Sequence, residues 1–123
     1  MNEVTDKQFN HLKIHTQYSI CEGALRISDL VKYCKTNKIR AVGLCDSNNL
    51  CGALEFSESV AKSKTQPIIG TQISIEYKGH FGKIPLFAKD LEGYKNLIKL
   101  SSKSYLDIKE NEEPHCKFED IEK

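Results

Sequence analysis

The chain has 123 residues, which is the length of one small domain or of part of a larger one. Hydrophobic residues make up 39% of the chain, which argues against wholesale disorder. The 18 Lys and Arg residues and 17 Asp and Glu residues leave a net charge of +1, which is too small to support nucleic-acid or membrane binding by the chain itself. No run reaches the roughly 18 to 20 apolar residues of a membrane-spanning helix, and the polar first ten residues do not resemble a signal peptide. We therefore expect a cytoplasmic location and no contact with a membrane.

The cysteine pattern supports the same compartment. The five cysteines are an odd number without a C-x-x-C pair, which disfavours a zinc ribbon and predicts free thiols in a reducing environment. Cys34 and Cys45 have apolar neighbours and are predicted core residues.

The first half of the chain reads as alternating strands and helices. Two apolar residues that alternate with polar ones predict a short strand over residues 11–15, followed by a loop over residues 16–23. Helical spacing then extends from Ser28, a candidate N-cap, to about Lys38. The continuous small apolar run at residues 41–45, bounded by turn residues, predicts a buried parallel strand.

The second half adds a hairpin to this pattern. The predicted elements are a helix over 50–64, a strand over 66–70, a hairpin over 72–88 with its turn at 79–82, a helix over 91–105, a loop over 110–114 and a short helix over 118–123. Pro85 predicts that the return strand of the hairpin lies at an edge of the sheet. The order β-α-β-α-β-β-α indicates an α/β layer or barrel with parallel strands, too thin to be complete.

Candidate ligands follow the predicted parallel strands. Ligands in α/β folds bind beyond the carboxyl ends of the strands, where His15, Glu22 and Asp46 could converge. Imidazole and carboxylate groups are the usual ligands of zinc, manganese or iron. The plainer alternative is that His15 bonds only to backbone and that Asp46 caps the helix that starts near Leu50. Both interpretations stay open on spacing alone.

A second polar cluster lies in the predicted hairpin. It consists of Lys78, His80 and Lys83, and we interpret it as a solvated hairpin tip rather than a phosphate site. No P-loop, dinucleotide fingerprint or nucleophile elbow is present.

Five blocks of the sequence together resemble a known family. They are HLKIHTQYS with the following EG at residues 11–23, AVGLCDSNNL at 41–50, GALEF at 52–56, QPIIG at 66–70 and LFAKDLEGYKNL at 86–97. They resemble, in order, the polymerase and histidinol phosphatase (PHP) domain, in the version that begins the alpha subunit of bacterial DNA polymerase III. The resemblance covers about residues 9 to 123.

The resemblance implies a fold and a parent protein. Residues 1–123 would form the first half of a distorted seven-stranded β/α barrel, with the rest of the barrel and the polymerase core outside this chain. The parent would be a DNA-directed DNA polymerase of DNA replication, a nucleotidyltransferase with Mg²⁺ at its own polymerase site. The implied partners are the remainder of the alpha subunit, the proofreading exonuclease subunit that some family members contact, and DNA through the parent protein.

Several positions depart from the metal-binding pattern of the family. The His-x-His pair of the first motif is matched by Lys13 and His15, and Ser47 stands where the second motif has its histidine. Gln72 replaces a carboxylate and Lys83 a later histidine, whereas Glu22 replaces an Asp and keeps a carboxylate. Lysines disfavour nearby divalent cations. We expect Lys13 instead to pair with Asp46 or Glu22 in place of a metal.

These departures predict a vestigial phosphoesterase pocket with no catalytic residue and no metal ligand. Its residues are His11, Lys13, His15, Glu22, Asp46, Ser47, Gln72 and Lys83. The favoured hypothesis is a structural, non-catalytic segment without a cofactor of its own. The alternatives are a metal-dependent PHP phosphoesterase, acting on a phosphate ester or as a proofreading nuclease, and a stand-alone interaction module.

Overall fold

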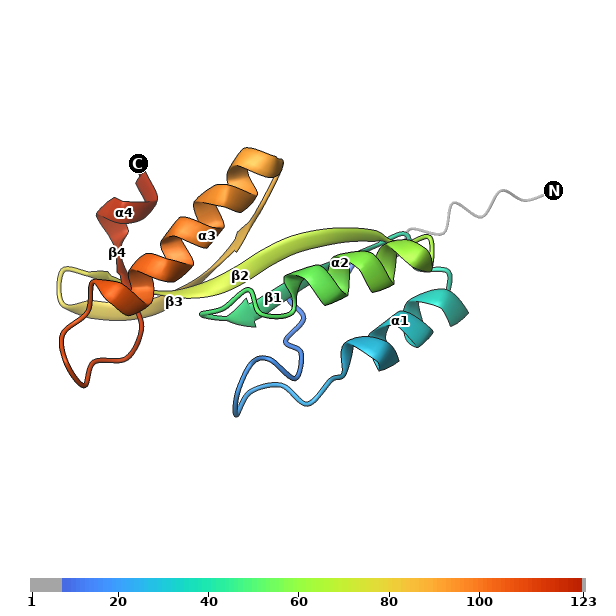
Figure 1. Cartoon of the computed structure of the whole chain (residues 1–123), viewed down its shortest axis with the longest axis horizontal. Helices are drawn as coiled ribbons and strands as arrows, with labels where there is room; N and C mark the ends of the chain where they lie inside the picture. Colours follow the sequence, from blue (N-terminus) through green and yellow to red (C-terminus); the bar gives the residue numbers. More distant parts are fainter. Residues whose placement is uncertain (1–7, 123) are drawn as a thin grey trace.

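The computed structural model describes residues 8–122. Its elements, in chain order, are α1 (Ile27–Thr36), β1 (Ala41–Ser47), α2 (Ala53–Lys62), β2 (Gln66–Tyr77), β3 (His80–Phe87), α3 (Leu91–Leu106), β4 (Cys116–Lys117) and α4 (Phe118–Glu122) (Figure 1). The two long parts of the predicted order, helix-strand-helix and then hairpin-helix, are therefore present.

The sheet is built around the long strand β2. The first half of β2 pairs in parallel with β1, the strand that the buried apolar run predicts, and its second half pairs antiparallel with β3. The short strand β4 continues the β1 side of β2, where Cys116 is the partner of Ile75. β3 pairs only with β2 within residues 8–122, so Pro85 lies on an edge strand, as predicted.

The predicted strand at residues 11–15 is too long. The structure has a single parallel bridge, between Ile14 and Leu44, although the segment does follow the free edge of β1. The Gly43 N–H donates to the His11 carbonyl at 2.7 Å, and the Cys45 N–H donates to the Ile14 carbonyl at 2.9 Å. A Cβ atom at residue 43 would lie 2.6 Å from the Leu12 carbonyl oxygen, so the close approach requires glycine.

The strand predicted over residues 66–70 and the hairpin strand predicted from residue 72 are one continuous strand, β2. Residues 70–72 have strand partners on both sides, since Thr71 pairs with Asp46 of β1 and with Leu86 of β3. The hairpin turn is also tighter than predicted, with Lys78 and Gly79 as its two central residues at φ +50° and +79°. Two consecutive positive φ angles fit the twist of a two-residue hairpin, so residues 80–82 belong to β3.

The start of α1 differs from the expected N-cap. The helix begins at Ile27 and not after Ser28, and its N-cap, Arg26, makes no side-chain capping bond. Ile27 is 1% exposed and packs in the core. Burial of this side chain in the first turn is worth more than one exposed cap, so tertiary packing sets the boundary.

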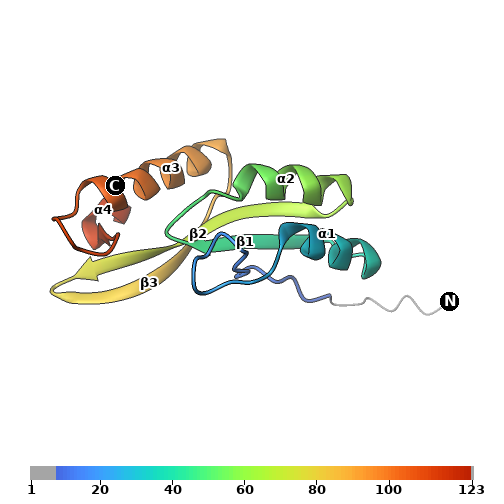
Figure 2. The ribbon, with the colours of Figure 1, turned by 60° about the horizontal axis from the view of Figure 1, so that its bottom comes forward.

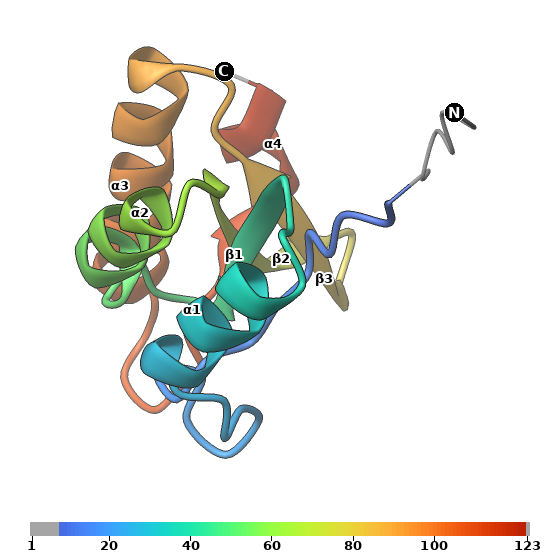
Figure 3. The same cartoon turned by 90° about the vertical axis from the view of Figure 1, so that its right-hand side faces the viewer.

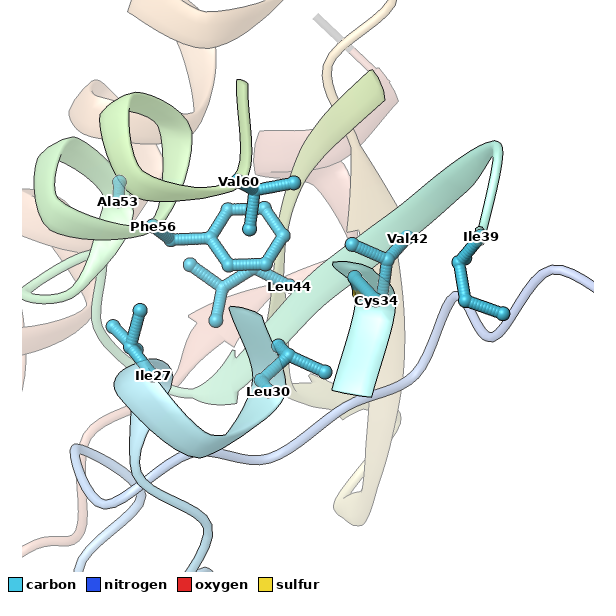
Figure 4. Close-up of a cluster of buried hydrophobic side chains, with 9 residues drawn as sticks. All are labelled: Ile27, Leu30, Cys34, Ile39, Val42, Leu44, Ala53, Phe56 and Val60. Atoms are coloured by element: carbon cyan, nitrogen blue, oxygen red, sulfur yellow. The ribbon is translucent and has the colours of Figure 1, made fainter. Parts of the chain in front are cut away.

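The helices cover one face of the sheet and leave the other open. α1, α2 and α3 lie on the same side of the strands in the end-on view (Figure 3), and β3 forms the free edge below α3 in Figure 2. One apolar cluster joins α1, β1 and α2, where Phe56 and Leu44 point toward each other (Figure 4). A second cluster joins Ile73 and Ile75 of β2 to the C-terminal elements. None of the helices within residues 8–122 is both long and apolar enough to cross a membrane.

Candidate functional site

The site lies at the carboxyl end of β1, on and beside the open face of the sheet. Val42 and Leu44 belong to the cluster under the helices, so the alternation along β1 places Ser47 on the opposite face. Ser47 is the register partner of Gln72, and Lys83 of β3 is the partner of Ser74. The fold thus brings together residues of three strands: Ser47 of β1, Gln72 and Ser74 of β2, and Lys83 of β3.

Asp46 ties the loop that precedes α1 to β1. Its side chain is fully buried, and its Oδ1 accepts from the Thr16 N–H at 2.6 Å and from the Ser19 hydroxyl at 2.7 Å. Its Oδ2 accepts from the Thr16 hydroxyl at 2.7 Å. The Ser19 oxygen in turn accepts from the Ser47 N–H at 3.0 Å. Every carboxylate oxygen of Asp46 is therefore occupied by a protein donor.

This geometry overturns the capping interpretation of Asp46. The N-cap of α2 is Gly52, which lies beyond the turn at residues 48–51 and makes no side-chain cap. Thr16 and Ser19, both fully buried, are the functional-site residues that sequence reasoning missed. Their only signal is that two hydroxyl residues follow His15 within one short loop.

Glu22 joins the same loop to the two strands on the open face. Its Oε2 accepts from the Ser47 hydroxyl, and its Oε1 accepts from the Lys83 ammonium at 2.9 Å. The Ser47 hydrogen bond, followed by the Lys83 bond, lowers the pKa of the Glu22 carboxyl. The pair is partly exposed, with half of the Lys83 side chain accessible to water.

The prediction that Lys13 pairs with Asp46 or Glu22 is wrong. Lys13 is exposed and forms no ion pair within residues 8–122, whereas Asp46 bonds to Thr16 and Ser19. The ammonium group at this site comes instead from Lys83, the other lysine at a metal-binding position of the family pattern. Lys83 therefore does not belong to a merely solvated hairpin tip.

The remaining predicted pocket residues are placed differently from one another. His15 is partly buried, and its charge contributes to the lowered pKa of Glu22. Gln72 is 5% exposed, and its Oε1 atom, like Nδ1 of His15, has no hydrogen-bond partner among the described residues. His11 is exposed, and its ring makes an edge contact with Phe9.

The described residues do not assemble a set of metal ligands. Within residues 8–122, no three His, Cys, Asp or Glu side chains lie close enough together to hold a metal ion. All five cysteines are free, and Cys34, Cys45 and Cys116 are buried. Burial raises the pKa of the Cys45 thiol to about 11, which leaves it unreactive at neutral pH.

Comparison with known proteins now identifies the fold and the family. A family model described as "PHP domain" matches residues 11–123, nearly the whole chain. The chain belongs to the PHP domain family. The predicted family is therefore confirmed.

The similar curated proteins include DNA polymerase III alpha subunits. The DNA polymerase III subunit alpha of Rickettsia conorii is 41% identical over 115 residues, which are 93% of this chain and 10% of that protein. The corresponding subunits of Helicobacter pylori (strain 26695) and Thermus aquaticus are 40% and 34% identical, and the matches cover 83% and 81% of this chain. In both, the match covers 9% of the relative. The PHP chain thus spans about a tenth of the length of these relatives.

A solved structure supports the fold alone. A crystal structure from Bifidobacterium adolescentis, of a protein described as a metal-dependent phosphoesterase, aligns with a TM-score of 0.63 at 17% identity. The alignment covers 80% of this chain and 33% of that protein. The predicted α/β fold, as part of a PHP-type barrel, is confirmed.

Proposed function

We propose that this PHP chain is a structural, non-catalytic segment of the alpha subunit of a bacterial replicative DNA polymerase. The observation that carries the proposal is the 41% identity to such a subunit over 93% of the chain. The parent protein would be a DNA-directed DNA polymerase that acts in DNA replication in the cytoplasm. Nucleotide transfer, with its Mg²⁺, would belong to the parent's polymerase core.

The donor set argues against a metal in the pocket of this segment. Lys83 places a positive charge 2.9 Å from the Glu22 carboxylate, where a divalent cation would be repelled. Both carboxylate oxygens of Asp46, the other acid, already accept hydrogen bonds from Thr16 and Ser19. A catalytic zinc site needs three or more His, Cys or carboxylate ligands, and the residues of this pocket do not supply them.

Protein contacts brace this pocket without a metal in the proposed segment. The Asp46 bonds hold the loop at residues 16–19 to β1, and the Glu22–Lys83 pair extends the connection to β3. The open face of the sheet then fits a partner that completes the barrel, which we assign to the remainder of the alpha subunit. The proofreading exonuclease subunit is a further candidate partner, and DNA would be contacted through the parent protein.

The parent protein can be tested directly in cells. An antibody raised against the 123-residue chain should detect a polypeptide about ten times as long, given that the chain spans 10% of its relatives. That polypeptide should extend primers, whereas the purified chain should not incorporate nucleotides. Detection of the 123-residue species alone would remove the polymerase assignment and favour a separate interaction module.

The absence of a metal can be tested on the purified chain. After dialysis, elemental analysis should find well under one zinc or manganese per chain. A variant with Lys13→His, Ser47→His, Gln72→Glu and Lys83→His restores the family ligands and should take up more metal. Lys32→His and Lys62→His, on exposed helix positions, serve as the matched control for added histidines.

The alternative of a metal-dependent phosphoesterase has one observation in its favour, the fold shared with the Bifidobacterium protein. It would replace the structural assignment if the unaltered chain retained stoichiometric metal and hydrolysed a generic ester such as p-nitrophenyl phosphate. Loss of that hydrolysis in Glu22→Gln, but not in Glu58→Gln on α2, would attach the activity to this pocket.

A further inference from the structure

We draw no further inference here: the strongest candidate, the apolar hollow of about 220 Å³ between α2 and α3 that Leu54, Ile69 and Tyr94 line, carries no proposal because the chain spans about a tenth of the length of its relatives and nothing in the structure shows what covers this helix face.

Discussion

Asp46→Asn is the substitution that best tests how this fold is held together. The change keeps the shape of a fully buried side chain but removes its charge, while three short hydrogen bonds converge on it. Hydrogen bonds to a charged group are worth about 1.5 to 3 kcal/mol each, against about 0.5 to 1.5 kcal/mol for neutral ones. The difference, roughly 1 kcal/mol per bond, gives a loss of about 3 kcal/mol.

The structure also limits this loss. In the asparagine variant, Oδ1 can keep the Thr16 N–H and the Ser19 hydroxyl, and the Thr16 hydroxyl can rotate to accept from the new amide. We therefore expect the free energy of unfolding to fall by about 2 to 3 kcal/mol, a large part of the 5 to 15 kcal/mol that is usual for a domain.

Urea denaturation followed by far-ultraviolet circular dichroism measures this loss. With a slope of about 1 to 3 kcal/mol per molar urea, the midpoint should fall by about 0.7 to 3 M. Asp29→Asn is the matched control, because Asp29 is exposed and only pairs with Lys32 at 3.7 Å, so its loss should be about 0.5 kcal/mol or less. Hydrogen exchange should also accelerate at residues 16–25. Equal midpoints for the two variants would show that the Asp46 bonds do not brace the loop.

Two further predictions concern Glu22 and the cysteines. The pKa of Glu22 is lowered in the folded chain, so the stability that Glu22 contributes is present above the ordinary glutamate pKa and is lost as the pH falls through the folded value. Lys83→Met should therefore reduce the acid sensitivity of the urea midpoint between pH 6 and pH 3. At pH 7 the same substitution should lower the free energy of unfolding by less than about 1 kcal/mol. An unchanged pH profile in this variant would count against the pairing. A maleimide reagent at pH 7 should label the exposed Cys21 and Cys51 in the folded chain and leave Cys45 unlabelled, because a pKa of about 11 keeps the Cys45 thiol protonated. Mass spectrometry measures the labelling of each cysteine. Rapid labelling of Cys45 would contradict its burial.

The sequence by itself determined the family and most of the elements. The buried run at residues 41–45 and the alternation before Tyr77 depend on local spacing, so β1 and the hairpin could be predicted. Pro85 marked the edge strand because proline cannot donate to a neighbour. The five blocks that begin with the motif at residues 11–23 likewise indicated the family, and with it the set of positions where metal ligands are missing.

Only the tertiary structure decided which of these positions act together. Lys13 and Lys83 are equivalent in a sequence pattern, since both are lysines at ligand positions. The register between β2 and β3 brings Lys83, and not Lys13, to Glu22. Asp46 has the spacing of a helix cap, yet the loop at residues 16–19 folds back and presents a buried N–H and two hydroxyls to it. A buried carboxylate must satisfy its oxygens with whatever donors the fold supplies, and spacing along the chain does not contain that information.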